Sequence, residues 1–379
     1  MIITIISDVL GQENNGTTIA TMNFIRSLKQ KGYEVRVVCP DQDKKGLPGY
    51  YVVKTYNLGR FLNRYVEKNG VSLAKANKKV LYEAIKDADA VHIIMPFSLG
   101  RAAARIAKKL DKPITAGFHC QAENFTSHIF MMNFGLANNV AYRIFYHNVY
   151  KYCDCIHYPS QFIRDTFEKI VGKTNGYVIS NGVNRDFVKV DIDKPEELND
   201  KFVILFIGRY SKEKSHPVLI KGVKKSKYEN RIQLIFAGTG PQKEKLEKLS
   251  QGLTNKPIMK FYSRKELIKV INYSDLYVHP AEVEIEAIAC LEAIACGLVP
   301  IISNSKRSAT RYFAISEKNL FNCNDSDDLA RKIDYWIEHP EEKRKMSNEY
   351  LGYTKKFDYD NCMNGMEMMI LDAIKRKSS

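Results

Sequence analysis

The stretch Phe202-Val-Ile-Leu-Phe-Ile207-Gly-Arg-Tyr-Ser-Lys-Glu-Lys-Ser215 joins an apolar run to a polar loop, and a helix is expected to begin near Pro217. Six consecutive apolar residues predict a strand that is buried on both faces. The same rhythm continues outward, with further apolar runs at residues 232–237, 258–262, 276–279 and 299–302. Apolar runs that alternate with amphipathic stretches are the βαβ pattern of a parallel sheet covered by helices.

The first half of the sequence repeats this scheme, so two α/β domains are expected. Its strands are predicted at residues 2–7, 34–39, 90–95, 113–118, 155–158 and 177–180. The polar, acidic segment 191–201 predicts a linker between a first domain at 1–190 and a second at 202–355. Beyond Pro340 the pattern is helical, and residues 356–379 are expected to form a helix on the outside that crosses back to the first domain.

Composition excludes several classes of protein. With 45% hydrophobic and 27% charged residues the chain is globular, and no apolar run is long enough to span a membrane. The first residues predict a strand and not a signal peptide, which favours the cytoplasm. Eight scattered cysteines predict neither a disulfide framework nor a metal site, since Cys153-Asp-Cys155 is one residue short of CxxC.

The formal charge of +15 favours a polyanionic partner, or else the surface is that of an ordinary lysine-rich protein. No RNP, KH or zinc-finger pattern is present, so no nucleic-acid partner is expected. Residues 60–112 carry 12 Lys and Arg against five Asp and Glu, which suggests a face that docks on an anionic membrane. Its candidate contacts are Arg60, Arg64, Lys78 and Lys79.

Cations follow the strand at 202–207. Arg209 can bind two oxygens of a diphosphate at once, while Lys214 can supply a point charge; a solvated basic loop is the alternative. The next strand ends in Ala237-Gly-Thr-Gly-Pro241, where Gly238 would let a ligand approach the backbone closely.

Carboxylates follow the strand at 276–279. Glu284 lies where this strand gives way to a helix, and Glu292 lies on the otherwise apolar helix. A carboxylate there is costly unless it is paired or binds a ligand. The backbone N–H groups at the helix start, near Ala287 and Ile288, can hold phosphate oxygens, and the carboxylates can accept hydrogen bonds from sugar hydroxyls.

Two segments of the first half are weaker candidates. Gly16 lies in the loop after the first strand, at the carboxyl end of the sheet where open α/β folds bind ligands, although a plain turn is the alternative. Apolar residues follow His119 in the segment 121–136, and they suit either an acceptor surface or a buried core. The residues named from this patch are Phe125, Ile129 and Phe130.

The pair Glu284 and Glu292, the GRxxxEK-like run at 208–214 and the Asn181-Gly-Val turn together resemble the retaining family 4 glycosyltransferases. The resemblance implies the GT-B fold, two Rossmann-like domains that face a central cleft. It also implies that Arg209 and Lys214 hold the donor diphosphate, that Glu284 binds the donor sugar and that Glu292 binds the ribose. The base would lie against Tyr262, Ser263 and Arg264, with further donor contacts at Gly16, Gly238, Ala287 and Ile288.

The resemblance also assigns a catalytic group in the first domain. His119 matches the active-site histidine near the sugar, and a buried histidine with satisfied hydrogen bonds is the alternative. His119 and Glu284 would orient the sugar, while Arg209 and Lys214 would stabilise the leaving diphosphate without a metal ion. The usual glycine-aromatic-glycine after the first glutamate is replaced by Ile285-Glu286-Ala287.

Within the family the chain resembles bacterial diacylglycerol glucosyltransferases. This implies a hexosyltransferase that moves glucose from UDP-glucose to a lipid such as diacylglycerol, needs no cofactor and lies on the inner face of the cell membrane. A glycan acceptor in capsule or cell-wall synthesis is the alternative. From another class, a nonenzymatic protein that binds membranes or nucleic acid would also account for the charge of +15.

Overall fold

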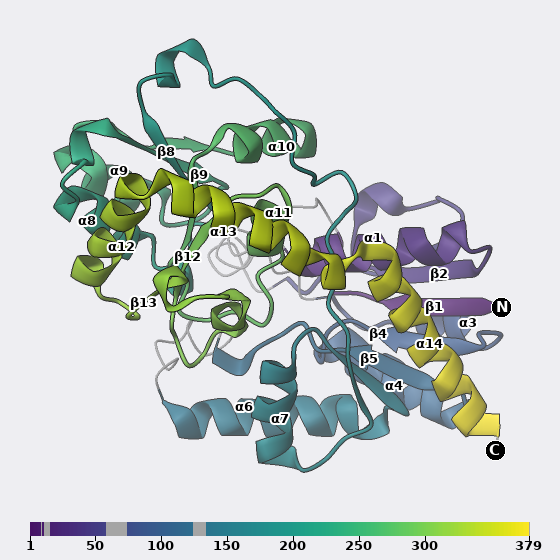
Figure 1. Ribbon diagram of the computed structural model, residues 1–379. Helices are drawn as coiled ribbons and strands as arrows, with labels where there is room; N and C mark the ends of the chain where they lie inside the picture. Colours follow the sequence, from purple (N-terminus) through teal and green to yellow (C-terminus); the bar gives the residue numbers. More distant parts are fainter. Residues whose placement is uncertain (9, 11–15, 58–73, 124–133, 379) are drawn as a thin grey trace. The chain divides into compact units, whose positions relative to one another are not determined.

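The computed structural model describes residues 1–8, 10, 16–57, 74–123 and 134–378, and they form two compact units (Figure 1). The first unit comprises Met1–Asn181 and Asp360–Ser379, and the second comprises Gly182–Tyr359. The boundary therefore precedes the segment 191–201, which the sequence analysis takes as the linker. Val183, Phe187 and Leu198 are buried in the core of the second unit, so the chain on both sides of residue 190 packs there.

The first unit is built on a parallel sheet of seven strands. Their order is β3-β2-β1-β4-β5-β6-β7, so the chain reverses its direction across the sheet between β1 and β4. The strands are β1 (Ile2–Ile6), β2 (Glu34–Cys39), β3 (Tyr50–Val52), β4 (Ala90–Ile93), β5 (Ile114–Gly117), β6 (Cys155–Tyr158) and β7 (Gly176–Val178). The helices between them are α1 (Gly16–Gln30), α3 (Lys78–Ile85), α4 (Ser98–Lys109), α6 (Gly135–Asn148) and α7 (Gln161–Val171).

The second unit is built on a parallel sheet of six strands in the order β10-β9-β8-β11-β12-β13. The strands are β8 (Phe202–Ile207), β9 (Ile232–Ala237), β10 (Ile258–Lys260), β11 (Leu276–His279), β12 (Pro300–Ser303) and β13 (Leu320–Phe321). The helices are α8 (His216–Lys225), α9 (Lys243–Leu249), α10 (Arg264–Tyr273), α11 (Ile288–Ala295), α12 (Ser326–Glu338) and α13 (Pro340–Tyr353). Since the chain leaves β8 on one side for β9 and returns on the other for β11, a topological switch point lies between β8 and β11.

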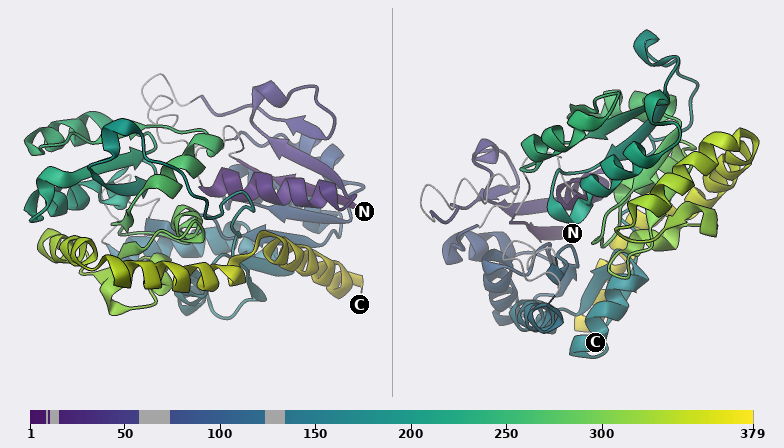
Figure 2. Two further views of the ribbon diagram at one scale, coloured as in Figure 1. Left: turned by 45° about the horizontal axis from the view of Figure 1, so that its top comes forward. Right: turned by 90° about the vertical axis from the view of Figure 1, so that its left-hand side faces the viewer.

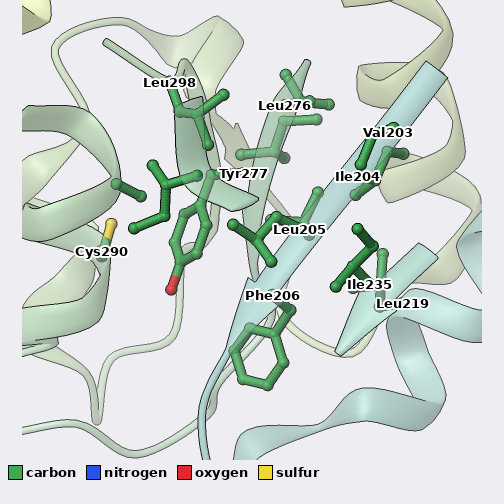
Figure 3. Packing of buried hydrophobic residues seen from close by; sticks show 14 of the residues in the cluster. Val203, Ile204, Leu205, Phe206, Leu219, Ile235, Leu276, Tyr277, Cys290 and Leu298 are labelled. Carbon is green, nitrogen blue, oxygen red and sulfur yellow. The ribbon is translucent and has the colours of Figure 1, made fainter. Parts of the chain in front are cut away.

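The apolar core of the second unit fixes β8. Side chains from both faces of this strand are buried, among them Leu205 and Phe206 (Figure 3). Leu219 of α8, Tyr277 of β11 and Cys290 of α11 belong to the same cluster. Each fully buried apolar side chain stabilises the fold by about 1.5–3 kcal/mol, so the loop that begins at Gly208 starts from a rigid strand.

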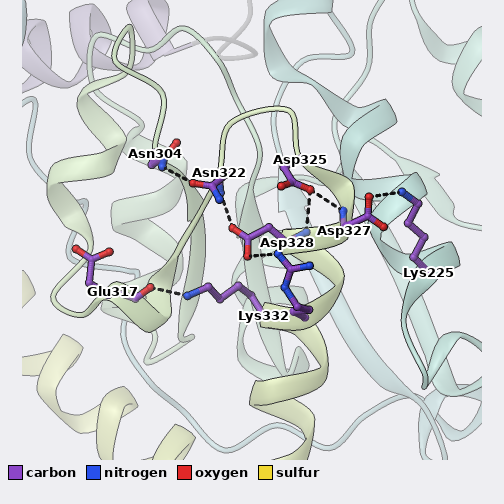
Figure 4. Close-up of polar contacts among 9 residues, drawn as sticks. Lys225, Asn304, Glu317, Asn322, Asp325, Asp327, Asp328 and Lys332 are labelled. Atoms are coloured by element: carbon purple, nitrogen blue, oxygen red, sulfur yellow. Dashed lines mark hydrogen bonds and ion pairs between the residues drawn. The ribbon is translucent and has the colours of Figure 1, made fainter.

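Polar contacts tie the loop after β12 to the edge of the sheet (Figure 4). The amide of Asn304 donates to Asn322 at 3.0 Å, and Asp328 accepts from the backbone N–H of Asn322 at 2.8 Å. Asp325 caps α12 by accepting the N–H groups of the two residues at 327 and 328. Lys225 of α8 pairs with Asp327 at 2.7 Å, so α8, α12 and the end of β13 are joined.

The C-terminal helix α14 (Tyr359–Ser378) packs within the first unit (Figures 1 and 2). Its Glu367 pairs with Lys31 and accepts from the Tyr33 hydroxyl at 2.5 Å. The chain passes between the units twice, at residues 181–182 and 359–360. Next to these passages, the backbone N–H of Val183 donates to the carbonyl of Phe357 at 2.9 Å.

Candidate functional site

Loops from three strands of the second unit meet at the carboxyl edge of its sheet. The loop after β8 is bonded to the loop after β9, since the N–H groups of Gly208 and Tyr210 donate to Ala237 and Thr239, both at 3.0 Å. The loop after β11 is bonded to the loop after β8 through the N–H of Glu282, which donates to the carbonyl of residue 213 at 2.8 Å. These loops lie at the switch point, where open α/β sheets bind ligands.

Lys214 and Glu284 form an ion pair at this point, although 70 residues separate them in the sequence. Both side chains are largely buried. Nε2 of His279 lies 3.3 Å from the Glu284 carboxylate without the alignment of a good hydrogen bond, and the Tyr277 hydroxyl lies 3.0 Å from Nδ1 of the same ring. Burial would raise the pKa of Glu284, but Lys214 and His279 outweigh it and lower this pKa to about 2, so the carboxylate stays ionised.

The loop that carries Glu284 is braced from its other side. The N–H of Ala309 donates to the carbonyl of Glu284 at 2.9 Å, and Arg307 forms an ion pair with Glu282. Within the described residues, positive φ angles outside glycine occur only at Asp111, Ser215 and Asn324. Ile285-Glu286-Ala287 therefore has a backbone that ordinary residues adopt, so glycines are not required there.

Glu292 is buried on α11 at 7% exposure. Desolvation raises its pKa to about 8, and the attraction of Arg264 offsets only part of this shift. Within the described residues, its carboxyl group has neither a hydrogen bond nor an ion pair. An unpaired buried carboxyl group destabilises the fold, and such groups concentrate at functional sites.

Glu292 should make stability depend on pH. Its folded pKa lies above the ordinary 4.5, so between these values the folded chain holds a proton that the unfolded chain releases. The free energy of unfolding then falls as the pH rises towards about 8, by at most ~1.4 kcal/mol per pH unit. Glu292→Gln removes this titrating group. Between about pH 6 and 8 the melting temperature of the variant should therefore fall less than that of the wild type. Parallel melting profiles would contradict the assignment.

Arg209 is half-buried and directly follows Gly208 at the end of β8. Gly238 has a structural role that the sequence analysis missed, because a Cβ atom there would lie 2.1 Å from the carbonyl oxygen of Gly208. The loops after β8 and β9 could not pack in this way around any larger residue. The sequence predicts the approach of a ligand at this glycine, whereas the contact between the two loops already requires it.

The turn before α10 is the expected contact of the base. Ser263 caps the helix in the predicted capping box, with its N–H donating to Glu266 at 2.8 Å. Its carbonyl accepts from Leu267, so both of its backbone groups are occupied. Tyr262 is partly buried beside it, and Arg264 begins α10. A base at this turn would therefore find the N–H of Ser263 already engaged, with Tyr262 and Arg264 on either side of it in the sequence.

Ala287 and Ile288 lie at the start of α11. Ala287 is its N-cap and makes no side-chain hydrogen bond there. The N–H of Ile288 donates to the carbonyl of Glu286 at 3.2 Å, whereas the carbonyl of Ala287 accepts from Cys290 at 2.9 Å. The first turn of the helix is thus held by backbone hydrogen bonds between residues two or three positions apart.

The other predicted residues belong to the first unit. Gly16 is the first residue of α1 and is exposed. His119 follows β5, and its ring centroid lies 5.6 Å from that of His157. Burial first, and then His157 and His92, hold the pKa of His119 well below its usual value, so the ring is neutral at pH 7.

The predicted membrane contacts lie partly outside the described residues. Lys78 and Lys79 are exposed at the start of α3, which Asn77 caps. The predicted membrane or acceptor contacts Arg60, Arg64, Phe125, Ile129 and Phe130 all lie outside the described residues.

Three buried polar residues near these loops and strands have no role predicted from the sequence. His279 lies beside Glu284, and the Tyr277 hydroxyl contacts the other side of the His279 ring. Asp8 directly follows β1 at 1% exposure, and neither carboxylate oxygen has a hydrogen bond of good geometry within the described residues. Desolvation raises the pKa of Asp8 to about 8, although the nearby amides of Ala74 and Leu99 lower it in part. An Asp directly after a buried strand is the sequence feature that could have identified it.

The described ranges contain no cluster of three or more His, Cys, Asp or Glu side chains that could hold a metal ion. In the same ranges no helix is both long and apolar enough to cross a bilayer.

Two family models match adjacent parts of the chain: Glycosyltransferase Family 4 matches residues 14–187, and Glycosyl transferases group 1 matches residues 188–350. Alpha-monoglucosyldiacylglycerol synthase of Acholeplasma laidlawii is 24% identical over 96% of this chain and 95% of its own length. Sulfoquinovosyl transferase SQD2 of Arabidopsis thaliana is 26% identical over 89% of this chain and 66% of its own length.

A solved structure shows the same fold. Anabaena HepE, crystallised with UDP and glucose, has a TM-score of 0.74 at 14% identity, over 97% of this chain and 98% of its own. The two parallel sheets and both family matches point to the same fold and the same family. The chain belongs to the family 4 glycosyltransferases and has the GT-B fold.

Proposed function

We propose that this enzyme transfers glucose from UDP-glucose to a lipid acceptor such as diacylglycerol, with retention of the anomeric configuration. The observation that carries the proposal is the ion pair of Lys214 and Glu284 at the switch point, with Glu292 on the helix that follows. The name of the Acholeplasma relative supports glucose and diacylglycerol. The Arabidopsis relative is named for sulfoquinovose, so the donor sugar has to be tested directly.

The charges of the second unit suit a nucleotide-sugar donor. Arg209 and Lys214 would bind the diphosphate, and this would allow Glu284 to accept hydrogen bonds from the sugar hydroxyls. Because Glu284 is already ionised, it needs no proton transfer before it binds the sugar. Glu292 would accept hydrogen bonds from the ribose hydroxyls, which would provide the polar partners that the described residues do not offer its buried carboxyl group.

In the proposed reaction the acceptor hydroxyl attacks the anomeric carbon on the face from which the diphosphate leaves. The leaving phosphate takes the hydroxyl proton, so no separate base is needed. Arg209 and Lys214 stabilise the charge that develops on the diphosphate. Glu284 and the neutral His119 orient the sugar and stabilise positive charge at its anomeric carbon.

A screen of UDP- and GDP-sugars, with and without diacylglycerol in detergent, tests donor and acceptor separately. The proposal expects glucosyl diacylglycerol as the product, with α-linkage conserved from donor to product. Two results together would contradict the lipid acceptor and favour a glycan acceptor: the rate of UDP-glucose hydrolysis does not change when diacylglycerol is added, and glucose is transferred to a soluble glycan.

Transfer should not depend on a divalent cation. Cationic side chains would perform the charge stabilisation that a metal ion performs in other transferases. Turnover measured after treatment with EDTA should equal turnover of the untreated enzyme. Loss of activity that only magnesium or manganese restores would contradict this mechanism.

A further inference from the structure

The outer face of α6 carries an unusual set of exposed apolar side chains. Leu136, Val140 and Ile144 are 66%, 50% and 51% exposed, and Phe134, just before the helix, is 53% exposed. A spacing of four residues places the three helical residues along one face. Three large aliphatic side chains in one exposed row cost solvation free energy unless something covers them.

The opposite face of α6 is already packed. Ala141, Tyr142 and Phe145 are buried against the first unit, and the Tyr142 hydroxyl donates to Glu123 at 2.8 Å. A helix that is apolar on both faces is typical of one that is covered on both faces. The described residues bury the inner row, whereas they leave the outer row exposed.

Charge indicates what kind of partner would cover the outer row. Arg143 is exposed on the same face as Val140 and Ile144, and the sequence of α6 contains no acidic residue. The short helix η2 (Tyr150–Tyr152) follows α6 and adds Lys151. An apolar row with cations and no carboxylates has the chemistry of a helix that lies in the interface of an anionic bilayer.

Helix α4 extends the basic surface. The ring of Phe97 at its start lies 6.2 Å from that of Phe145, and the ammonium groups of Lys108 and Lys151 lie over Tyr152 at 5.3 and 5.1 Å. α4 contains no acidic residue, and its exposed cations are Arg101, Arg105, Lys108 and Lys109.

The other neighbour of α6 does not oppose this charge. Asp165 and Glu168 of α7 are balanced by Arg164 and Lys169 on the same helix. Glu168 is engaged locally, since its carboxylate accepts from Arg164 at 3.1 Å. The surface made by α6, η2 and α4 therefore keeps its positive charge.

We propose that the outer face of α6, flanked by the cations of η2 and α4, is the surface by which this enzyme docks on an anionic lipid bilayer, with Leu136, Val140 and Ile144 inserted among the acyl chains. The inference rests on the proposed lipid acceptor, which it provides with a route to the enzyme. Its residues are other ones than the predicted membrane contacts Arg60, Arg64, Lys78 and Lys79.

The test is co-sedimentation of the full chain with vesicles of phosphatidylcholine alone or mixed equally with phosphatidylglycerol. Leu136→Gln, Val140→Gln and Ile144→Gln combined should weaken binding to the mixed vesicles by about tenfold or more, because glutamine preserves the helix but removes the inserted area. The matched control Met368→Gln changes one of the most exposed apolar side chains of α14 and should bind as the wild type does.

Charge is tested in the same assay. A triple variant combines Arg101→Gln, Arg105→Gln and Lys108→Gln. It should bind the mixed vesicles more weakly than the wild type at low salt, and this difference should disappear at high salt. Lys243→Gln, Lys245→Gln and Lys248→Gln in α9 remove the same charge elsewhere and should leave binding unchanged. Equal binding to both kinds of vesicle, or wild-type binding by the α6 variant, would overturn the proposal. So would a dimer of the wild type that the α6 variant dissociates, because the row would then bind a second copy.

Activity separates this inference from the proposed function. In detergent, the double variant Val140→Gln and Ile144→Gln should transfer glucose to dispersed diacylglycerol at the wild-type rate, while its transfer to diacylglycerol in vesicles should fall with binding. Vesicle binding by α6 without any transfer to lipid would leave the docking surface in place and contradict the lipid acceptor. If the protein transfers glucose to lipid in detergent but binds no vesicles, the lipid acceptor is supported and the docking surface is contradicted.

Discussion

Arg209→Ala is expected to lower turnover by about a hundredfold or more, while the protein stays folded. The side chain lies in a loop at the end of β8 and not in the apolar core, so its removal leaves the packing of the sheet unchanged. What the variant loses is the cation that we propose binds the leaving diphosphate, and removal of one such group typically costs ~3–4 kcal/mol of transition-state stabilisation. Steady-state kinetics with UDP-glucose, together with thermal melting, measures both effects.

Lys212→Ala is the matched control for Arg209→Ala. Lys212 lies in the same loop and carries the same charge, but its side chain is exposed. Its removal should change turnover by less than about threefold, as expected for an exposed charge. A folded Arg209→Ala protein with turnover close to the wild type would exclude the proposed diphosphate site.

Glu284→Gln should reduce turnover to a similar extent. The amide is nearly isosteric with the carboxylate, but it cannot balance Lys214 or accept two hydrogen bonds from sugar hydroxyls with the same strength. The variant also leaves Lys214 without its ionised partner in a largely buried position, so some loss of stability is expected. Turnover at saturating donor should therefore be compared at a temperature where thermal melting shows both proteins folded.

Glu282→Gln is the control for this change, since Glu282 lies in the same loop and pairs with Arg307. It should lower stability slightly and leave turnover nearly intact. If Glu282→Gln and Glu284→Gln lower turnover equally, the effect belongs to the conformation of the loop and not to a contact of Glu284 with the sugar.

The sequence predicted the fold well where strands are central. Long apolar runs such as those of β8 and β9 are buried on both faces, which is the pattern that sequence reasoning detects. It missed β3 and β13, which have three and two residues and lie at the edges of their sheets. Neither β3 nor β13 contains a run of buried apolar residues, so neither periodicity nor length distinguishes them from loops.

Single residues of the site could be predicted from the sequence, but the contacts between them could not. The isolated position of Glu292 on an apolar helix indicated a costly carboxylate, and the structure places it buried, with no hydrogen bond or ion pair to any described residue. That Lys214 meets Glu284 depends on β8 lying beside β11, which the order of the residues does not reveal. His279 was missed because a histidine at the end of an apolar strand has no spacing that distinguishes it from a core residue.

The double passage of the chain between the two units has a mechanical consequence. The crossing segments at residues 181–182 and 359–360 are held side by side by the hydrogen bond from Val183 to Phe357. A single cut of the chain at residues 181–182 would therefore leave α14, which packs in the first unit, covalently attached to the second unit. The packing of α14 in the first unit would then hold the two fragments together, in part through the ion pair of Glu367 with Lys31.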